Sequence, residues 1–351
     1  MKQKELNELT ALYALSRDAV LCVRGGKIIF ANAAAQERFP ACVGQAAKNW
    51  LPPLIFDGEG DSWVCTLPDD EGSISVTCVR CGDSFVLSLP RLEHGRTVIP
   101  PAALSELRTT AYNLHMAADL MLGHCCDNEK VDTYASILQH NYYRLLRLTR
   151  NLSDVNTLLS GELSLHRQAW NLDSLCRRLV DSVGFFIKEQ QPVLRYESTG
   201  SGFMVMGDRE RLEQLLLNLL SNAMLHTPRD GEISVHLSRR DNHLILSVND
   251  NGSGMGESEL GSLFTVRELP SVLEGGAGLG LFVSQGIVRA HGGTMLVESR
   301  SGKGTRIRVM LPASQSISFR DRDDIPCGPG LILTELSTVL GRESYDKRYR
   351  D

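Results

Sequence analysis

The chain has 351 residues, enough for two or three domains, and its 42% hydrophobic and 23% charged residues are ordinary for a globular protein. This composition excludes a disordered, collagenous or fibrous chain. The net charge of −5 argues against a general binder of nucleic acids or anionic membranes. No apolar run approaches the roughly 18–20 residues that span a bilayer, and the first residues lack the apolar core of a signal peptide. We therefore expect a cytoplasmic protein without a membrane span.

The nine cysteines do not form a metal-binding pattern. Cys78 and Cys81 have the spacing of a ligand pair, but no second pair accompanies them, and a structural zinc site needs four ligands. We expect the cysteines to be buried or half-buried thiols on strands.

Residues 1–95 have the pattern of short strands and short helices. Two apolar runs flank Gly25 and Gly26, which predicts a β-hairpin, and a helix of small residues is expected over 33–39. Three strands are then expected over 63–67, 74–79 and 84–89. This order of elements resembles a PAS sensory domain, and the segment DAVLCVRGGKIIFANAAAQERF carries the resemblance.

Residues 98–162 hold two heptad patterns, which predict two helices with one apolar seam each. The seam positions are Leu104, Leu107, Ala111, Leu114, Ala118 and Met121 in the first helix, and Val131, Tyr134, Leu138, Asn141, Leu145, Leu148, Leu152, Val155 and Leu159 in the second. Joined by a short loop, the helices form an antiparallel hairpin, and two hairpins packed as a four-helix bundle bury both seams. The sequence therefore predicts a homodimer through residues 98–162, with Asn141 fixing the register.

Residues 168–313 alternate strands, helices and glycine-rich loops, which indicates an α/β domain. Strands are expected over 232–237, 244–248, 294–298 and 305–311. In the tail, residues 314–351, we expect a loop over 323–330 and a short helix over 331–340. No motif in the tail indicates a role.

Four short motifs of the α/β segment carry chemistry. Asn218 and Asn222 lie four residues apart on one helix face, where amide oxygens can ligate Mg²⁺. Asp250 ends an apolar strand, where its carboxylate can accept from an exocyclic amine, and the glycines after it let the backbone approach a planar ring. The glycine-rich run 275–281 leads into a helix, whose first N–H groups can hold phosphate. The fourth motif, 302–305, is a glycine turn before the last strand.

In this order, the four motifs resemble the N, G1, G2 and G3 boxes of the ATPase domain shared by histidine kinases, type II topoisomerases, MutL proteins and heat-shock chaperones. The resemblance implies an α/β sandwich that binds ATP and Mg²⁺ under a mobile lid, with Phe264 at the F-box position. It implies Asp250 at adenine, Asn222 with Asn218 at Mg²⁺, and Gly278 and Gly280 at the phosphates. The other nucleotide-binding positions that it implies are Gly252, Gly254, Gly256, Leu279 and Thr305.

The segment before the ATPase-like region narrows the resemblance. The run from Ser105 through Glu106 to Thr109 resembles the H-box of sensor histidine kinases, which is usually written His-Glu-Leu-Arg-Thr-Pro. The chain as a whole thus resembles an α+β multidomain sensor histidine kinase, with a PAS-like sensor domain, a helical hairpin that forms a dimeric four-helix bundle, and an ATPase domain. Ser105, Glu106 and Thr109 are then the implied catalytic positions, and a response regulator is the implied partner.

Two residues depart from the family pattern. Ser105 stands where the family has its phosphoacceptor histidine; a serine hydroxyl needs a base such as Glu106, and its phosphoester is a poor donor for onward transfer. His115, about 15 Å further along the helix, cannot share one docking geometry with Ser105. Leu225 stands where the family often has a lysine that reaches toward phosphate.

Three functions stay open. The first is a sensor kinase that uses MgATP to phosphorylate Ser105, another residue or a partner. The second is a degenerate, ATP-binding pseudokinase that acts by conformation or by forming a heterodimer with an active kinase. The third is a response-regulator phosphatase, because Glu106 and Thr109 also resemble the family's phosphatase-assisting positions. The paired heptad helices argue against a chaperone or mismatch-repair ATPase.

Overall fold

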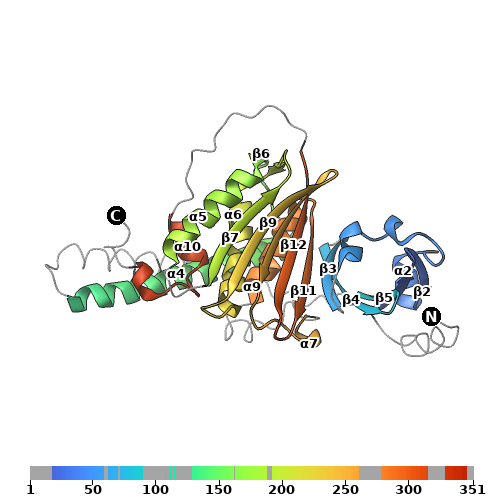
Figure 1. Cartoon of the computed structure of the whole chain (residues 1–351), viewed down its shortest axis with the longest axis horizontal. Coiled ribbons are helices and arrows are strands. Elements are labelled where there is room, and N and C mark those ends of the chain that lie inside the picture. Colours follow the sequence, from blue (N-terminus) through green and yellow to red (C-terminus); the bar gives the residue numbers. More distant parts are fainter. Residues whose placement is uncertain are drawn as a thin grey trace.

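A computed structural model describes residues 18–58, 62–69, 72–89, 107, 111, 114, 129–161, 163–187, 192–260, 278–314 and 329–345. One ten-stranded sheet contains strands from the N-terminal and the C-terminal parts of the chain, in the order β2-β1-β5-β4-β3-β11-β12-β10-β9-β7. Figure 1 shows the long helices α5, α6 and α9 on its C-terminal half and the short α2 on its N-terminal half. The chain therefore has an α+β fold. Within the described residues, no helix is long and apolar enough to cross a membrane.

The N-terminal half of the sheet contains five antiparallel strands. They are β1 (Ala19–Arg24), β2 (Lys27–Ala31), β3 (Ser62–Asp69), β4 (Gly72–Cys81) and β5 (Ser84–Leu89). The predicted hairpin is confirmed: Gly25 and Gly26 both have positive φ, as a tight β1–β2 turn requires. Helix α2 (Ala33–Arg38) begins at Asn32, whose side chain accepts from the backbone N–H of Ala35. Two short 3₁₀ helices, η1 (Ala47–Asn49) and η2 (Pro53–Asp57), complete this half.

The C-terminal half of the sheet is built from β7 (Val193–Thr199), β9 (Glu232–Arg240), β10 (His243–Asp250), β11 (Thr294–Arg300) and β12 (Gly304–Pro312). A separate pair, β6 (Gln168–Asn171) and β8 (Met204–Gly207), lies outside it. The helices are α5 (Leu172–Phe186), α6 (Arg209–His226), α7 (Glu257–Leu260) and α9 (Gly278–Ala290). The expected strands of this segment are confirmed, each extended by one to three residues at an end. The leucine-rich faces of α5, α6 and α9 and the inner faces of the strands share one core.

The two halves join where β3 pairs antiparallel with β11, a junction that we call the sheet junction. Leu296 of β11 lies opposite Cys65 and belongs to the buried core of the N-terminal half. The backbone N–H of Met295 also donates to the Thr66 hydroxyl at 3.1 Å. Main-chain pairing and one shared core thus connect the halves.

Helix α4 (Glu129–Leu159) is the second heptad helix, and its prediction is confirmed. The first helix lies outside the described residues, apart from Leu107, Ala111 and Leu114. In the single chain, part of the α4 seam is open: Leu138 is 45% exposed, and exposed Asn141 donates its amide to the Ile137 carbonyl. The homodimer stays a prediction.

The tail corrects the sequence analysis. The structure has a helix, α10 (Pro329–Glu335), that begins inside the expected loop 323–330 and ends five residues before Leu340. Proline at the first position suits a helix start because its missing N–H has no partner there anyway. A turn and a 3₁₀ helix, η3 (Arg342–Tyr345), follow. The apolar side chains that the tail adds to the main core are Ile332, Leu333, Leu336, Leu340 and Tyr345.

The prediction of buried thiols on strands is confirmed for Cys22, Cys65 and Cys78, whereas buried Cys42 lies in a loop and buried Cys176 on α5; none of the five is in a disulfide. Burial raises the pKa of Cys65 to about 12, which leaves it protonated at neutral pH. Across the part of the chain that the structure describes, no cluster of His, Cys, Asp and Glu is arranged to hold a metal ion.

Candidate functional site

Helix α6 is fixed at its start by polar contacts. Asp208 caps it by accepting from the backbone N–H of Arg211, and the same carboxylate accepts from the N–H of His166. The backbone N–H of Asp208 donates to Nε2 of buried His291, which follows the end of α9. Burial lowers the pKa of His291, which keeps its ring neutral and able to accept. These contacts set the position of α6 against α9.

Asn218 and Asn222 lie on α6 at the end of the site that faces α9. Asn218 is fully buried, and its amide nitrogen is 3.5 Å from the Gly280 carbonyl oxygen. Its Oδ1 atom has no hydrogen-bond partner among the described residues, and neither has Nδ2 of half-buried Asn222. Unpaired buried amide atoms are costly, so this pair is ready to bind a polar ligand.

Asp250 ends β10 and turns its carboxylate toward two backbone donors. Oδ1 accepts from the N–H of Gly252 at 2.9 Å and from the N–H of Thr305 at 3.1 Å. Burial raises the pKa of Asp250, while these two hydrogen bonds act in the opposite direction. Because both bonds fall on Oδ1, Oδ2 is available to accept from a ligand.

The loop after Asp250 packs too closely for side chains. A Cβ atom on Gly252 would collide with the His226 carbonyl at the end of α6, and one on Gly254 would collide with the Arg300 carbonyl. Gly254 also has a φ of +62°, which glycine adopts at least cost. A Cβ atom on Gly304, which lies on the neighbouring turn, would collide with the backbone of Asp250. The glycines let this loop lie between α6 and the β11–β12 turn.

The start of α9 faces α6. Gly278 and Leu279 open the helix, and Gly280 faces the Asn218 side chain: a Cβ on Gly280 would lie 3.4 Å from Asn218 Oδ1. The same position would lie 3.9 Å from a guanidinium nitrogen of Arg147, which belongs to α4. A helix N-terminus, two amides and a guanidinium thus converge here, which suits an anion with a bound cation.

Three contacts bring the four predicted motifs together. Asn218 meets Gly280, the N–H of Ser253 donates to His226 at the end of α6, and the N–H of Thr305 donates to Asp250. Gly256 lies at the rim, where its N–H donates to the Glu259 carboxylate at 2.9 Å.

Several predicted residues are not part of this constellation. Ser105, Glu106, Thr109 and Phe264 lie outside the described residues, as does the lid segment 261–277. Leu225, one turn beyond Asn222 on α6, is 44% exposed and brings no charge to the site.

Arg147 is the site residue that sequence reasoning missed. It lies on the α4 face opposite the heptad seam, and such a face usually points to solvent. Its side chain is instead buried against α6 and the tail. Nothing in the local sequence distinguishes it from the exposed Arg144.

The residues present fit a Mg²⁺–adenine nucleotide. Asn218 Oδ1 is an unpaired oxygen of the kind that binds Mg²⁺ or its water ligands, and Asp250 Oδ2 is an acceptor beside a glycine loop. The N-terminus of α9, where helix N–H groups can bind phosphate, lies beside Asn218, since Asn218 contacts Gly280 in the first turn of that helix.

Comparison with known proteins agrees with this geometry. Residues 207–315 match the family described as histidine kinase-, DNA gyrase B-, and HSP90-like ATPase. The circadian input-output histidine kinase CikA of Synechocystis sp. is 32% identical over 190 residues, covering 52% of this chain and 25% of CikA. The alginate biosynthesis sensor protein KinB of Pseudomonas aeruginosa is 27% identical over 285 residues, covering 78% of this chain and 47% of KinB. The chain thus spans less than half of either relative.

Among solved structures, full-length ShkA in complex with AMPPNP is similar, with a TM-score of 0.52 at 22% identity, over 63% of this chain and 47% of ShkA. At this identity the likeness concerns the fold alone. The four converging motifs, the matched family and the histidine kinase relatives lead to one conclusion: the chain carries an ATPase domain of the histidine kinase-, DNA gyrase B-, and HSP90-like family.

Proposed function

We propose that the protein is a cytoplasmic sensor protein of the histidine kinase family that binds MgATP between the Asp250 loop, α6 and α9. The observation that carries the proposal is the meeting of the four motifs through three direct contacts: Asn218 with Gly280, Asp250 with Thr305, and Ser253 with His226 at the end of α6. Asp250 holds the adenine amine through Oδ2. The Asn218–Asn222 pair binds Mg²⁺, and the start of α9 binds the phosphates.

The remaining parts of the proposal concern signalling. Residues 1–95 act as a PAS-like sensor, and the strand order β2-β1-β5-β4-β3 supports this role. Residues 98–162 dimerise, residues 168–313 bind the nucleotide, and a response regulator is the partner. The described part of the tail, residues 329–345, packs into the core of the nucleotide-binding unit and against α4.

Bound ATP supplies a phosphoryl group, and the chain's own residues decide where it goes. Ser105 attacks only if a neighbour such as Glu106 removes its hydroxyl proton. Leu225 adds no positive charge, so backbone N–H groups and the metal carry the stabilisation of the phosphates. These two residues favour a second candidate function: an ATP-binding pseudokinase, or a response-regulator phosphatase that uses Glu106 and Thr109.

Radiolabelling with γ-labelled ATP and Mg²⁺ separates the candidates. Label that survives acid points to Ser105, and acid-labile label points to a histidine such as His115. Nucleotide binding without label supports the second candidate, and a Ser105→His variant that gains label shows that the ATPase domain is competent. If calorimetry detects no MgATP binding and Asp250→Ala changes nothing, the proposal is wrong.

A further inference from the structure

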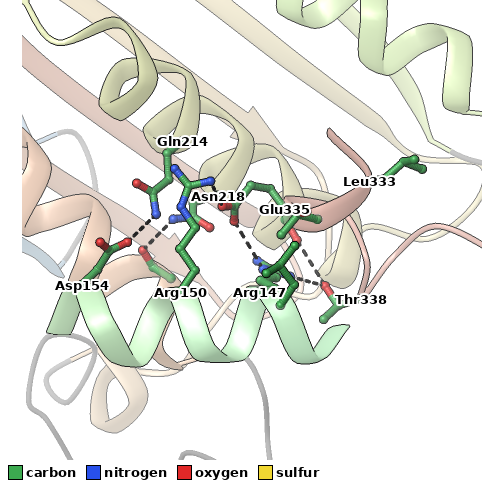
Figure 2. A network of polar contacts seen from close by, with 12 residues as sticks. Arg147, Arg150, Asp154, Gln214, Asn218, Leu333, Glu335 and Thr338 are labelled. Carbon is green, nitrogen blue, oxygen red and sulfur yellow. Dashed lines mark hydrogen bonds and ion pairs between the residues drawn. The ribbon is translucent and has the colours of Figure 1, made fainter. Parts of the chain in front are cut away.

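The tail docks beside the nucleotide-binding motifs, between α4 and α6. Thr338 accepts from Arg147 of α4 at 2.6 Å and lies 3.3 Å from the hydroxyl of Ser221, the residue before Asn222 on α6. His140 of α4 contacts the Ser337 carbonyl at 2.8 Å, and Tyr345 stacks on His140. Helix α10 also contacts α4 and α6, so the tail lies against the helices that carry Arg147 and Asn218, as Figure 2 shows.

Glu335 of the tail is buried in this region. Its side chain is 0% exposed and lies between two arginines of α4: Oε2 is 3.6 Å from Arg147 and Oε1 is 3.4 Å from Arg150. In Figure 2 the carboxylate, both guanidinium groups and Asn218 face one another. An anion supplied by the chain itself thus occupies the cationic side of the site.

The fit of this carboxylate is incomplete. Neither oxygen of Glu335 has a hydrogen-bond partner among the described residues, and the Nε atom of Arg147 and Oδ1 of Asn218 also lack one. Of these four buried atoms three are acceptors and one, Arg147 Nε, is a donor, although Glu335 is paired with two arginines. Buried ion pairs without such hydrogen bonds do not offset the cost of removing their charges from water. A larger anion with more acceptor oxygens would accept hydrogen bonds from the guanidinium groups, which Glu335 does not.

Arg147 lies beside the helix end at which we place that anion, and Arg150 shares the Glu335 carboxylate with it. The guanidinium of Arg147 lies 3.9 Å from the Cβ position of Gly280, at the start of α9. It also supplies, from another helix, a positive charge of the kind that Leu225 cannot supply. We propose that Arg147 and Arg150 form a binding site for the terminal phosphates of a nucleoside triphosphate and that Glu335 occupies this site when the tail is docked, so that tail docking and nucleotide binding compete. This inference rests on the proposed nucleotide binding.

Competition has a reciprocal consequence. If the docked tail lowers the affinity for the triphosphate by some factor, the triphosphate weakens docking of the tail by the same factor. Coupling between sites is commonly five- to 150-fold, so we take about fivefold as the smallest effect that counts. Adenosine, which has no phosphate, has no reason to compete with Glu335.

The test uses the full chain and calorimetry with Mg²⁺–AMPPNP and with adenosine. Glu335→Gln keeps the shape of the side chain and removes its charge; it should raise AMPPNP affinity at least about fivefold and leave adenosine affinity unchanged. Glu213→Gln is the matched control, because Glu213 is also buried and paired with an arginine on α6, but at the first turn of the helix. Its AMPPNP affinity should equal that of the unmodified chain.

Hydrogen exchange gives the second readout. AMPPNP should accelerate amide exchange in 329–345 of the unmodified chain, whereas adenosine should not. Arg147→Ala should lower AMPPNP affinity and also expose 329–345; should it fail to fold, Arg150→Ala serves instead.

Equal AMPPNP affinity of Glu335→Gln and the unmodified chain, with tail exchange unaffected by AMPPNP, overturns the competition and leaves the proposed function intact. Absence of AMPPNP binding by the unmodified chain and Glu335→Gln alike overturns both.

Discussion

The ATPase domain is contacted from two sides, and different kinds of interaction form the two contacts. At the sheet junction, β3 and β11 pair through main-chain groups over three residue pairs, with Leu296 inserted in the neighbouring core. On the opposite side, α4 meets α6 through buried charges such as Asp154, and the tail adds Glu335, which pairs with arginines of α4, beside its apolar side chains in the main core. An anionic ligand has nothing to displace at the sheet junction, whereas it can replace a carboxylate at the tail. We therefore expect the first contact to be permanent and the second to respond to ligands.

The largest expected loss of stability comes from a substitution at the sheet junction. Leu296→Ala removes a fully buried side chain from the N-terminal core and should cost about 2–5 kcal/mol in unfolding free energy. Urea denaturation followed by tryptophan fluorescence measures this, since Trp63 on β3 is fully buried. Leu225→Ala, at an exposed helical position, is the control and should change stability by less than about 0.5 kcal/mol. If both variants lost a similar amount of unfolding free energy, packing at the junction would not contribute to the stability of the fold.

Leu296→Ala also tests whether the two contacts are independent. If the junction is purely structural, the folded variant should bind AMPPNP as the unmodified chain does. A change in nucleotide affinity that survives correction for the unfolded fraction would show that the sheet transmits signals, and the comparison drawn above would then be wrong.

The second-largest loss of stability is expected at the polar contact between α4 and α6. Buried Asp154 accepts from Arg211 and from Gln214, both at 2.7 Å. Asp154→Ala leaves the guanidinium and the amide without this partner, at a cost of about 3 kcal/mol. Asp154→Asn retains one acceptor oxygen and should lose less. Thermal denaturation measures both variants, and equal losses would indicate that packing rather than charge matters here.

The sequence predicted the local elements better than the contacts between them. Gly25 and Gly26 marked a hairpin because the turn requires positive φ at both. The Asn218 and Asp250 motifs were found because their spacing on a helix and at a strand end is itself the signal. Alternating patterns do not say which strand edges meet, so the pairing of β3 with β11 was not foreseen.

The tail shows a second limit of prediction from the sequence. Its leucines indicated a helix, but the role of Glu335 depends on Arg147 and Arg150, nearly two hundred positions earlier in the chain. In the heptad pattern those arginines look solvent-facing, and it is the packing of α6 and the tail on α4 that buries Arg147. Polar contacts between distant segments carry no local signature in the sequence.

A smaller loss, in the stability of tail docking, is expected for a substitution of Thr338. Thr338→Val keeps the shape and removes the hydroxyl, and with it the contacts to Arg147 and Ser221. Because Arg147 is charged and buried, the loss should be about 1–2 kcal/mol of tail docking. Faster amide exchange confined to 329–345 would measure it. Ser344→Ala, in η3, is the control; if both variants exchange alike, the Arg147 contact does not hold the tail.

The smallest effect is a pH dependence inside the ATPase core, away from both contacts. His291 accepts from the N–H of Asp208, and its other ring nitrogen lies 2.8 Å from the Ile287 carbonyl, an arrangement that requires the neutral ring. Burial lowers its pKa in the folded state below the usual 6.5. The contribution of His291 to stability is thus complete above pH 6.5. It is lost as the pH falls through the lower folded-state pKa, because the unfolded chain takes up the proton first.

His291→Gln isolates this contribution. A glutamine can accept from Asp208 but does not titrate in this range, so its stability should fall less between pH 7 and pH 5 than that of the unmodified chain. Urea midpoints at the two pH values measure the difference. Because nothing at the sheet junction involves His291, Leu296→Ala should retain the full pH dependence. If His291→Gln instead loses as much stability on acidification as the unmodified chain, the acid sensitivity belongs to other groups, and buried Glu335 can be excluded next by repeating the measurement on Glu335→Gln.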